Sequence, residues 1–367
     1  MCSAGRSFSV NRKISVVAMR IVLSTSVRFI LHCCVGCVGF CSIAFGQQSS
    51  TNLAEAYLQL PVGARAVGLA GAYTAIANEP IALFYNPAGL AFLPNRPQIS
   101  LMASPQEFGR VHSAFAYGQS INEQFAVGAG LIHYWNGSFL ERNVLGTPLR
   151  ELSSEQYAVS IGGTWRSGDF AVGATGKYLI NTLRGTGSKG TAFTMDLGAK
   201  ADIADLFSVG IAAQNLFGAM TWNNTSVSER LPYSLRAGIA TEFSLEKETY
   251  TVRKNVRGET ETIELPSESY IALTLDAVLT QYDHTPIVVL GAEYAPIQLF
   301  SVRGGMNVLG EQGGTTKAFP LTRWGGGISL VPPIDSLPFK FQIDYSIAND
   351  IVATGNIDHF ISLIVDI

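Results

Sequence analysis

Residues 191–202, with the sequence TAFTMDLGAKAD, decide the fold of this chain. In an extended strand, successive side chains point to opposite faces, so every second residue shares a face. One face of this stretch is apolar, and the other is polar and charged. The apolar face comprises Phe193, Met195, Leu197, Ala199 and Ala201, and the polar face comprises Thr194, Asp196, Gly198, Lys200 and Asp202. The pattern predicts a β-strand with one face toward lipid or a core and the other toward polar surroundings.

The same split recurs along the chain, for example in residues 233–243 and 339–347. From residue 98 to residue 367 the sequence divides into about 14 such segments of roughly 8 to 14 residues, separated by turn-rich stretches. An even number of strands is what a bacterial outer-membrane barrel requires when both chain ends lie on the periplasmic side. A soluble β-sandwich also alternates, but its apolar faces meet in a core and its charges face water.

Composition and connector lengths favour the barrel over the sandwich. Hydrophobic residues make up 47% of the chain and charged residues only 14%, whereas soluble domains carry about a quarter charged residues. The connectors at residues 166–169 and 202–205 are short, while those at residues 136–153, 215–231 and 307–318 are long and fall on the opposite side. Tight periplasmic turns and long outer loops give this alternation. The expected fold is therefore all-β, a 14-stranded antiparallel transmembrane β-barrel.

The first 46 residues have the layout of a signal peptide, and the alternative is a lone anchor helix. An apolar run at residues 29–45 follows five basic residues and ends in Ala44-Phe45-Gly46, which suits signal peptidase. All five cysteines lie in this leader, so we expect the exported chain to have no disulfide and no thiol chemistry. The leader holds five of the 25 Lys and Arg residues and no acidic residue. The remaining 20 basic and 28 acidic residues give a net charge of −8, which disfavours nucleic acid as a partner.

Residues 47–97 precede the expected barrel and contain a glycine- and alanine-rich tract with little alternation. A segment this apolar must be buried, and we expect it to form a hatch that plugs the lumen of a barrel at residues 98–367. Glycine inside the strands fits this arrangement, because glycine lets one backbone approach another closely and allows sharp curvature. The strand glycines expected to do so are Gly128, Gly130, Gly162, Gly163, Gly173, Gly176, Gly325, Gly326 and Gly327.

Two motifs in residues 47–97 resemble the N-terminal hatch of FadL-like outer-membrane transporters. They are GARAVGLAGA at residues 63–72 and YNPAGL at residues 85–90. Their expected site residues are Gly63, Arg65, Gly68, Gly71, Asn86, Pro87 and Gly89. More closely, the chain resembles the PorV/PorQ family of FadL-like barrels, through AQNL at residues 213–216, LPYSLRAG at 231–238, LGAEY at 290–294 and VRGG at 302–305. This resemblance implies a 14-stranded FadL-like barrel with an N-terminal hatch in its lumen.

Charged residues at inward positions of the expected strands mix both signs, which predicts a polar network in the lumen. Its expected members are Lys177, Asp196, Lys200, Arg236, Glu242, Asp276, Glu293, Arg303, Arg323, Lys340 and Asp344. The network forms either a selective polar path or salt bridges between wall and hatch. We favour the salt bridges, because buried charges of opposite sign satisfy one another. Arg65 and Asn86 are the expected partners from the hatch.

No constellation in the sequence indicates an enzyme. The five histidines never fall at metal-ligand spacing, and no Ser or Cys lies in a nucleophile elbow. Residues 184–190, RGTGSKG, resemble a phosphate-binding loop but lack its spacing and the helix that follows it. We therefore expect no catalytic residues, no cofactor and no bound metal.

Residues 244–267 form a long, densely charged connector that breaks the alternation of short and long. Counted from a periplasmic N-terminus, it is an insertion on the periplasmic side, where short turns are expected. Residues 250–252 and 260–263 flank residues 255–258, which predicts a β-hairpin that projects from the barrel. A partner can extend the edge strand of such a hairpin. The alternative is a solvated excursion with no partner.

Three functions stay open from the sequence. The PorV/PorQ resemblance implies a type IX secretion accessory or protein-binding barrel, whose partners are secreted proteins or components of the secretion machinery. The second function is a FadL-like channel for uptake of hydrophobic small molecules, and the third is a structural barrel. All three place the protein in the outer membrane of a Gram-negative bacterium, with membrane lipid as a partner. A channel needs an apolar pocket bounded by the hatch and outer loops, whereas an accessory needs an exposed docking surface.

Overall fold

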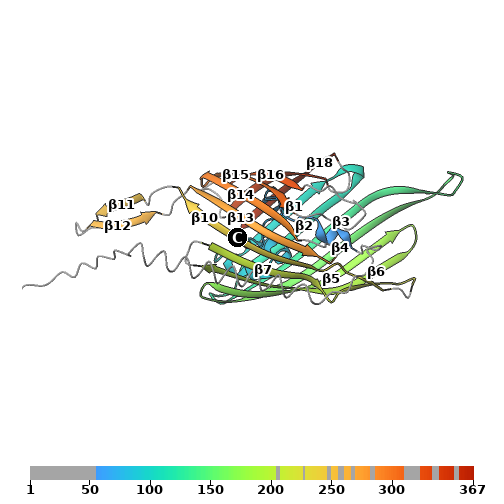
Figure 1. Ribbon diagram of the computed structural model, residues 1–367, viewed down its shortest axis with the longest axis horizontal. Coiled ribbons are helices and arrows are strands. Elements are labelled where there is room, and N and C mark those ends of the chain that lie inside the picture. Colours follow the sequence, from blue (N-terminus) through green and yellow to red (C-terminus); the bar gives the residue numbers. More distant parts are fainter. Residues whose placement is uncertain are drawn as a thin grey trace, which may run out of the picture. The chain divides into compact units, whose positions relative to one another are not determined.

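Figure 1 shows the computed structural model of the chain. The structure describes residues 55–203, 207–225, 228–245, 249–254, 260–265, 269–281, 286–309, 323–332, 339–350 and 355–367. The expected signal peptide at residues 1–46 and the expected start of the hatch at residues 47–54 lie outside the described residues. In the described part of the chain, no helix is long and apolar enough to cross a membrane.

Fourteen antiparallel strands close into a barrel, which confirms the predicted strand number. Each strand of the wall pairs with the next wall strand along the chain, and the last pairs with the first, so that Gln98 lies opposite Asp366. The wall strands are β1 (Gln98–Pro105), β2 (Val111–Ser120), β3 (Phe125–Arg142), β4 (Pro148–Ser167), β5 (Phe170–Arg184), β6 (Ser188–Ile203), β7 (Phe207–Leu216), β10 (Ser234–Ser244), β13 (Tyr270–Thr280), β14 (Ile287–Ile297), β15 (Phe300–Leu309), β16 (Trp324–Leu330), β17 (Lys340–Asn349) and β18 (Ile357–Asp366).

Four further strands in the described residues do not belong to the closed wall. β8 (Ala219–Trp222) pairs with Gly190 and Thr191 near the start of β6, and it also pairs with β9 (Ser228–Arg230). β11 (Thr249–Lys254) and β12 (Thr260–Leu265) pair only with each other, in a two-stranded sheet. The hairpin predicted within residues 244–267 is therefore present.

The inner and outer faces of the wall differ as the alternation predicts. In β6, Thr194 and Asp196 are buried on the inner face, while Phe193 is 66% exposed on the outer face. The outer face carries further exposed aliphatic side chains, such as Ile161 on β4 and Ile211 on β7. A closed barrel whose outer surface is apolar is suited to the hydrocarbon of a bilayer, because every backbone group is paired within the wall.

The two ends of the barrel carry different connectors. At the end where β1 begins and β18 ends, tight turns join β2 to β3, β4 to β5 and β14 to β15. At the opposite end, β3 and β4 continue as a two-stranded ribbon to a turn at residues 143–147. The prediction of a long loop at residues 136–153 is therefore wrong. Most of it is strand, because Phe139 pairs with Leu152 and Leu140 with Glu151 beyond a β-bulge.

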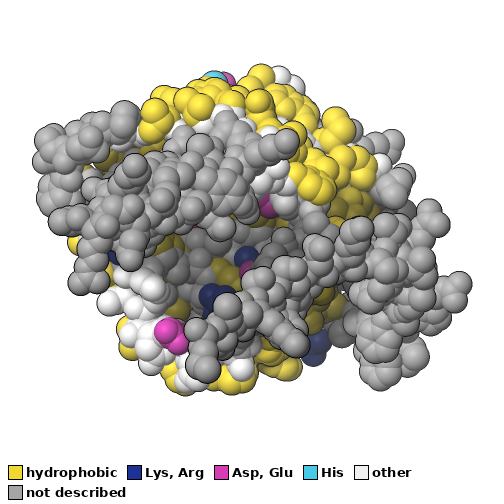
Figure 2. All heavy atoms as spheres, turned by 90° about the vertical axis from the view of Figure 1, so that its left-hand side faces the viewer, with side chains coloured by type: hydrophobic (Ala, Val, Ile, Leu, Met, Phe, Trp, Pro, Cys, Tyr) yellow, Lys and Arg dark blue, Asp and Glu magenta, His cyan; other side chains and the backbone are white. Residues whose placement is uncertain are grey.

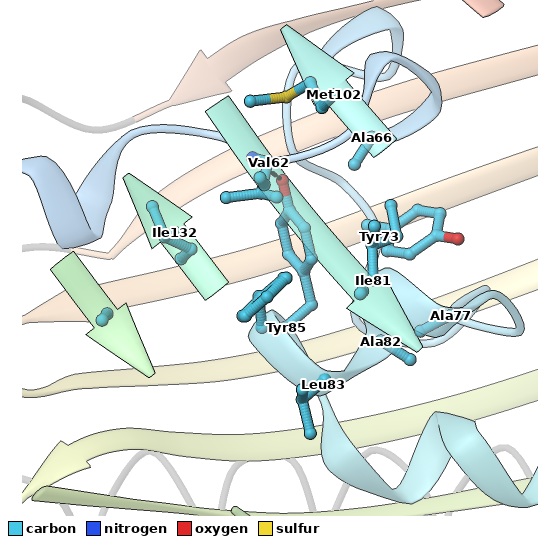
Figure 3. Packing of buried hydrophobic residues seen from close by; sticks show 14 of the residues in the cluster. Val62, Ala66, Tyr73, Ala77, Ile81, Ala82, Leu83, Tyr85, Met102 and Ile132 are labelled. Atoms are coloured by element: carbon cyan, nitrogen blue, oxygen red, sulfur yellow. Dashed lines mark hydrogen bonds between the residues drawn. The ribbon is translucent and has the colours of Figure 1, made fainter. Parts of the chain in front are cut away.

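Residues 55–97 form the lumen segment, which is largely buried against the inner faces of the wall strands. Its short helices are η1 (Ala56–Gln59), α2 (Ala64–Gly68), η2 (Pro80–Phe84) and η3 (Pro87–Phe92), and a further turn, η4 (Glu107–Gly109), joins β1 to β2. Proline at the start of η2 and η3 suits the first helical position, which needs no N–H. Figure 3 shows Val62 and Tyr85 of the segment beside Met102 of β1 and Ile132 of β3.

Wall glycines make room for the lumen segment. A Cβ atom added to Gly325 on β16 would lie 2.0 Å from the carbonyl oxygen of Val67, and one added to Gly305 on β15 would lie 2.4 Å from the carbonyl carbon of Leu69. Similarly close approaches to the segment occur at Gly118, Gly128, Gly130, Gly162, Gly173, Gly198, Gly210 and Gly291.

Four of the predicted glycines, Gly163, Gly176, Gly326 and Gly327, do not lie against the lumen segment. An added Cβ at any of them would meet only other wall residues. Gly163, Gly176 and Gly326 each follow or precede an inward position by one residue, so they lie on the opposite face. Gly327 instead lies against Ser346 of β17.

Candidate functional site

The first motif, residues 63–72, folds tightly enough to lie against β15. Gly63 and Gly71 adopt positive φ angles of 86° and 89°, which glycine tolerates without steric strain. A Cβ atom added to Gly68 would lie 2.7 Å from Cγ of Arg303. The motif glycines therefore shape the turn and admit an arginine side chain of the wall.

The second motif ties the lumen segment to β6 through Asn86. The fully buried Asn86 amide donates to the carbonyl oxygens of Thr74 and Ala199, at 3.0 Å each, and its oxygen accepts from the backbone N–H of Ala88. Pro87 opens η3, and a Cβ atom added to Gly89 would lie 2.7 Å from the carbonyl oxygen of Ala77. Asn86 thus bonds to backbone carbonyls and not to the charged wall residues that the sequence suggested.

Asp276 on β13 holds the middle of the lumen segment. Its fully buried carboxylate accepts hydrogen bonds from the backbone N–H groups of Tyr73 and Thr74 and from the Thr74 hydroxyl. Arg236 on β10 lies 3.5 Å from the same oxygen, and it donates to the Gly71 carbonyl. Asp276 and Arg236 together therefore bind two backbone N–H donors and one backbone carbonyl acceptor of the turn at residues 71–74.

Arg65 joins the lumen segment to the wall in a cluster of charges. It donates to both carboxylate oxygens of Glu293 on β14, at 3.0 Å each, and to Glu79 of the segment at 2.8 Å. Arg303 lies 3.3 Å from Glu293 and 3.1 Å from Asp344 on β17. Charged side chains are visible in the middle of the barrel end in Figure 2, inside an outer ring in which hydrophobic side chains predominate. Because the two arginines and three carboxylates pair with one another, their burial is compensated.

Lys177 and Asp196 form an ion pair within the wall. The Lys177 ammonium lies 2.7 Å from Asp196 and donates to the Asn215 side chain, whose backbone N–H in turn donates to Asp196. Asn215 adopts a positive φ of 56° near the end of β7, where the register with β6 shifts. Lys200 instead reaches the lumen segment and donates to the Ala77 carbonyl at 2.9 Å.

Three residues of the expected network form no ion pair with another described residue. Glu242 and Lys340 are exposed. Lys340 is the first residue of β17, and Glu242 lies near the end of β10 in the same cross-strand row as Ala272 and Glu293. Arg323 is partly buried, and its backbone N–H donates to Asn307.

Much of the remaining lumen is filled by a packed cluster of apolar side chains. The segment and the wall together contribute Tyr57, Val62, Leu83, Phe84, Tyr85, Leu90, Met102, Ile132, Leu179 and Phe360. Sequence analysis missed the wall members, because each is a single apolar residue at an inward position between small or polar ones. That local break in the alternation is the signal that could have identified them.

Three other buried polar residues had no assigned role in the sequence. Ser104 and His112 are fully buried on the inner faces of β1 and β2. Glu55 begins the described segment and accepts a hydrogen bond from Asn181 at 2.7 Å. Burial raises the pKa of the Glu55 carboxyl from 4.5 to about 7.

No group of three or more potential metal ligands occurs among the residues that the structure describes. The predicted lack of catalytic activity and of a cofactor stays a prediction.

Solved outer-membrane barrels share this architecture. The crystal structure of a FadL homologue from Pseudomonas aeruginosa is similar to this chain with a TM-score of 0.51 and 11% identity, over 83% of this chain and 98% of that one. The chain has the FadL-like barrel fold. The Ralstonia pickettii toluene transporter TbuX (TM-score 0.49, 14% identity, 83% and 97% covered) and the Pseudomonas putida toluene transporter TodX (TM-score 0.49, 12% identity, 81% and 96% covered) are also similar. No family model matches the chain, and no curated protein matches its sequence.

The predicted FadL-like fold is confirmed, while the PorV/PorQ assignment stays a prediction. The closed antiparallel wall, its apolar outer face and its class of fold place the protein in the outer membrane of a Gram-negative bacterium.

Proposed function

We propose that this protein is an outer-membrane channel for a hydrophobic small molecule. The observation that carries the proposal is the apolar cluster inside the barrel, which includes Met102, Ile132, Leu179 and Phe360 of the wall. A porin that conducts ions has a polar, water-filled lumen. An apolar lumen instead favours an apolar solute, because transferring such a solute out of water is favourable.

The FadL-like fold supports the same function, because the resemblance to FadL-like outer-membrane transporters implies uptake of hydrophobic small molecules. The similar TbuX and TodX structures are toluene transporters, which makes toluene a reasonable first probe.

We propose that residues 47–97 act as the hatch of this channel. The described part is fixed to the wall at Asp276, Glu293 and Ala199, so its complete removal from the lumen would break several buried hydrogen bonds at once. Local rearrangement between these anchors is therefore the favoured way to open a path.

Uptake of radiolabelled toluene tests the channel function. Cells of a Gram-negative host without a FadL-type protein are compared with and without this chain. We expect faster toluene uptake with the chain, and no faster uptake of a hydrophilic sugar. Ile132→Asp, which places a carboxylate in the apolar lumen, should abolish the increase, whereas Thr147→Asp on the exposed β3–β4 turn should not. Equal toluene uptake in cells with and without the folded chain would refute the channel.

A protein-binding barrel is the second candidate, and the β3–β4 turn favours it. Asn143 orders this turn by accepting hydrogen bonds from the backbone N–H groups of Leu145 and Thr147. The turn presents Val144 and Leu145 fully to solvent, beyond the barrel wall. Ordered aliphatic side chains on a projecting ribbon are a feature of docking surfaces.

Affinity capture from outer membranes separates this candidate from the channel. The wild-type chain and a Val144→Ser/Leu145→Ser variant are solubilised and purified in parallel. A docking role predicts a stoichiometric partner that the wild type retains and the variant loses, with toluene uptake unchanged. The absence of any partner specific to the wild type would remove this candidate.

A further inference from the structure

His112 is a buried histidine that has no hydrogen-bond partner among the described residues. It is fully buried on the inner face of β2, and neither ring nitrogen makes a hydrogen bond to any described residue. Buried polar groups in native proteins are almost always hydrogen-bonded, because an unpaired group loses its bonds to water and gains nothing in return. Each exception therefore needs a physical explanation.

Two further buried hydroxyls are in the same state, one on the strand next to His112 and one two ring contacts away from it. Ser104 on β1 is opposite His112 in the strand register, and its fully buried hydroxyl also lacks a partner among the described residues. Tyr57 of the lumen segment stacks on Tyr134 with 6.2 Å between the ring centroids. The Tyr134 and His112 rings meet edge to face with 5.9 Å between their centroids. The Tyr57 hydroxyl is buried and has no described partner either. The His112 imidazole and the Ser104 hydroxyl thus lie opposite each other on neighbouring strands, and Tyr134 links Tyr57 to them through its ring contacts.

The surroundings of this set of three polar side chains are apolar on the side facing the middle of the barrel. Met102, Ala114 and Ile132 are the next inward residues on β1, β2 and β3, and all three are buried in the apolar cluster. A molecule that fits here has a polar end and an apolar body.

The charges around the set indicate a neutral polar end. His112 contacts no carboxylate in the described structure, so its buried imidazole is neutral. The nearby cation, Arg110, is already bound to Asp350 and to the Tyr134 hydroxyl. Glu55 adds a further acidic group two residues before Tyr57. A carboxylate would therefore find no free cation, whereas a hydroxyl group can both donate to and accept from these three side chains, and a carbonyl group can accept from them.

We infer that Ser104, His112 and Tyr57 bind the polar end of a neutral amphipathic molecule, such as an alcohol or ketone with an aliphatic body. This inference rests on the proposed channel function and extends it, because it names the class of solute that binds in the lumen. The alternative is that ordered water alone satisfies the three groups.

Four probes with the same eight-carbon chain test the inference, namely n-octane, 1-octanol, octanoate and octylamine. The full chain in lipid nanodiscs is titrated with each probe, and empty nanodiscs correct for partition into lipid. ¹⁵N-labelled histidine reports on the His112 ring directly by NMR. We expect 1-octanol to bind about tenfold more tightly than n-octane and to shift the His112 nitrogen signals.

Variants separate recognition from folding. His112→Phe keeps an aromatic ring against Tyr134 but removes both nitrogens, and should bring the affinity for 1-octanol down to that for n-octane. Ser104→Ala should lower it by a smaller factor. His133→Phe is the matched control, because His133 lies one residue from Tyr134 on the same strand but on the outer face, and it should change nothing.

Several outcomes overturn the inference. They are equal affinities for 1-octanol and n-octane, tighter binding of octanoate or octylamine, or His112 signals that do not respond to 1-octanol, which would mean that water alone occupies the set. A His112→Phe variant that binds 1-octanol as the wild type does would also overturn it. If n-octane binds in the lumen while 1-octanol gains nothing, the channel function survives and only the assignment of the polar end fails. If no probe binds at all, both fail.

Discussion

Asp276 on β13 accepts two hydrogen bonds from Thr74 of the lumen segment, one from the backbone N–H at 2.9 Å and one from the hydroxyl at 2.6 Å. The same oxygen accepts from the Tyr73 N–H and faces Arg236. One buried carboxylate therefore neutralises a wall arginine and satisfies the backbone of the turn that crosses the lumen. The attachment of this one turn therefore depends largely on a single side chain of the wall.

Asp276→Ala should loosen the lumen segment strongly. The change leaves Arg236 without its carboxylate and the Thr74 N–H without its acceptor, which typically costs about 3 to 5 kcal/mol when such a pair is buried. Unfolding in lipid vesicles and trypsin cleavage at Arg65 measure the effect. Asp169→Ala, in the exposed turn between β4 and β5, removes the same group at a cost within about 0.5 kcal/mol. Similar stabilities for the two variants would contradict the anchoring role of Asp276.

Gly325→Ala and Gly326→Ala should differ although they are neighbours. The added methyl at Gly325 would lie 2.0 Å from the Val67 carbonyl oxygen, so the segment must shift, at a cost of about 1 to 3 kcal/mol or more. At Gly326 the nearest atom is the Arg303 carbonyl oxygen at 3.9 Å, an ordinary contact. Thermal unfolding of the two purified variants gives the comparison. If Gly326→Ala is the more damaging change, the assignment of inner and outer faces in β16 is reversed.

Ile161→Arg should destabilise the barrel much more than Val144→Arg. Both side chains are exposed, at 70% and 102%, but Ile161 lies on the outer face of the wall and Val144 in the turn beyond it. A charge on the lipid face costs about 2 to 4 kcal/mol near the midplane, whereas one in water costs almost nothing. Denaturant unfolding in vesicles measures both. A Met195→Arg and Thr194→Arg pair on β6 is a poorer test, because Thr194 is buried and donates to the Leu216 carbonyl.

The lumen segment should be held more firmly in acid than in mild alkali. Burial raises the pKa of Glu55 from 4.5 to about 7, so the folded protein binds a proton more tightly than the unfolded chain does. The stabilisation is fully present below pH 4.5 and is lost as the pH rises to about 7, by an amount on the order of 3 kcal/mol at most. Thermal unfolding of the wild type at pH 5 and pH 8 is compared with that of Glu55→Gln, which removes the titrating group. An identical pH dependence in the two proteins would assign the effect to other groups.

Single cysteines should locate the two ends of the barrel. All five natural cysteines lie within the first 41 residues, so a leader-less chain offers a unique label at any new cysteine. We expect a membrane-impermeant thiol reagent to modify Val144→Cys on intact cells. Lys254→Cys, at the end of β11, should react only after the outer membrane is opened, because an odd number of wall strands separates the two connectors. Labelling of Lys254→Cys on intact cells would place the β11–β12 hairpin outside.

The sequence alone determined the class of fold, the number of wall strands and the face of each strand. Alternation is a local property, since side chains along any extended strand point to opposite sides whatever the strand pairs with. Phe193 and Asp196 could therefore be assigned to opposite faces without knowing their neighbours. The apolar, glycine-rich character of residues 55–97 similarly required burial, because so apolar a segment is not stable in water.

Only the tertiary structure decided which residues meet. Glu293 binds Arg65, at a sequence separation of 228, and no local pattern distinguishes it from the equally charged Glu242, which stays exposed. The unpartnered set of Ser104, His112 and Tyr57 is likewise visible only after β1, β2 and the lumen segment come together. Burial and pairing depend on strand register and on what fills the barrel. The alternation of a single strand determines neither the strand register nor the contents of the barrel, because it repeats every two residues whatever partner lies opposite.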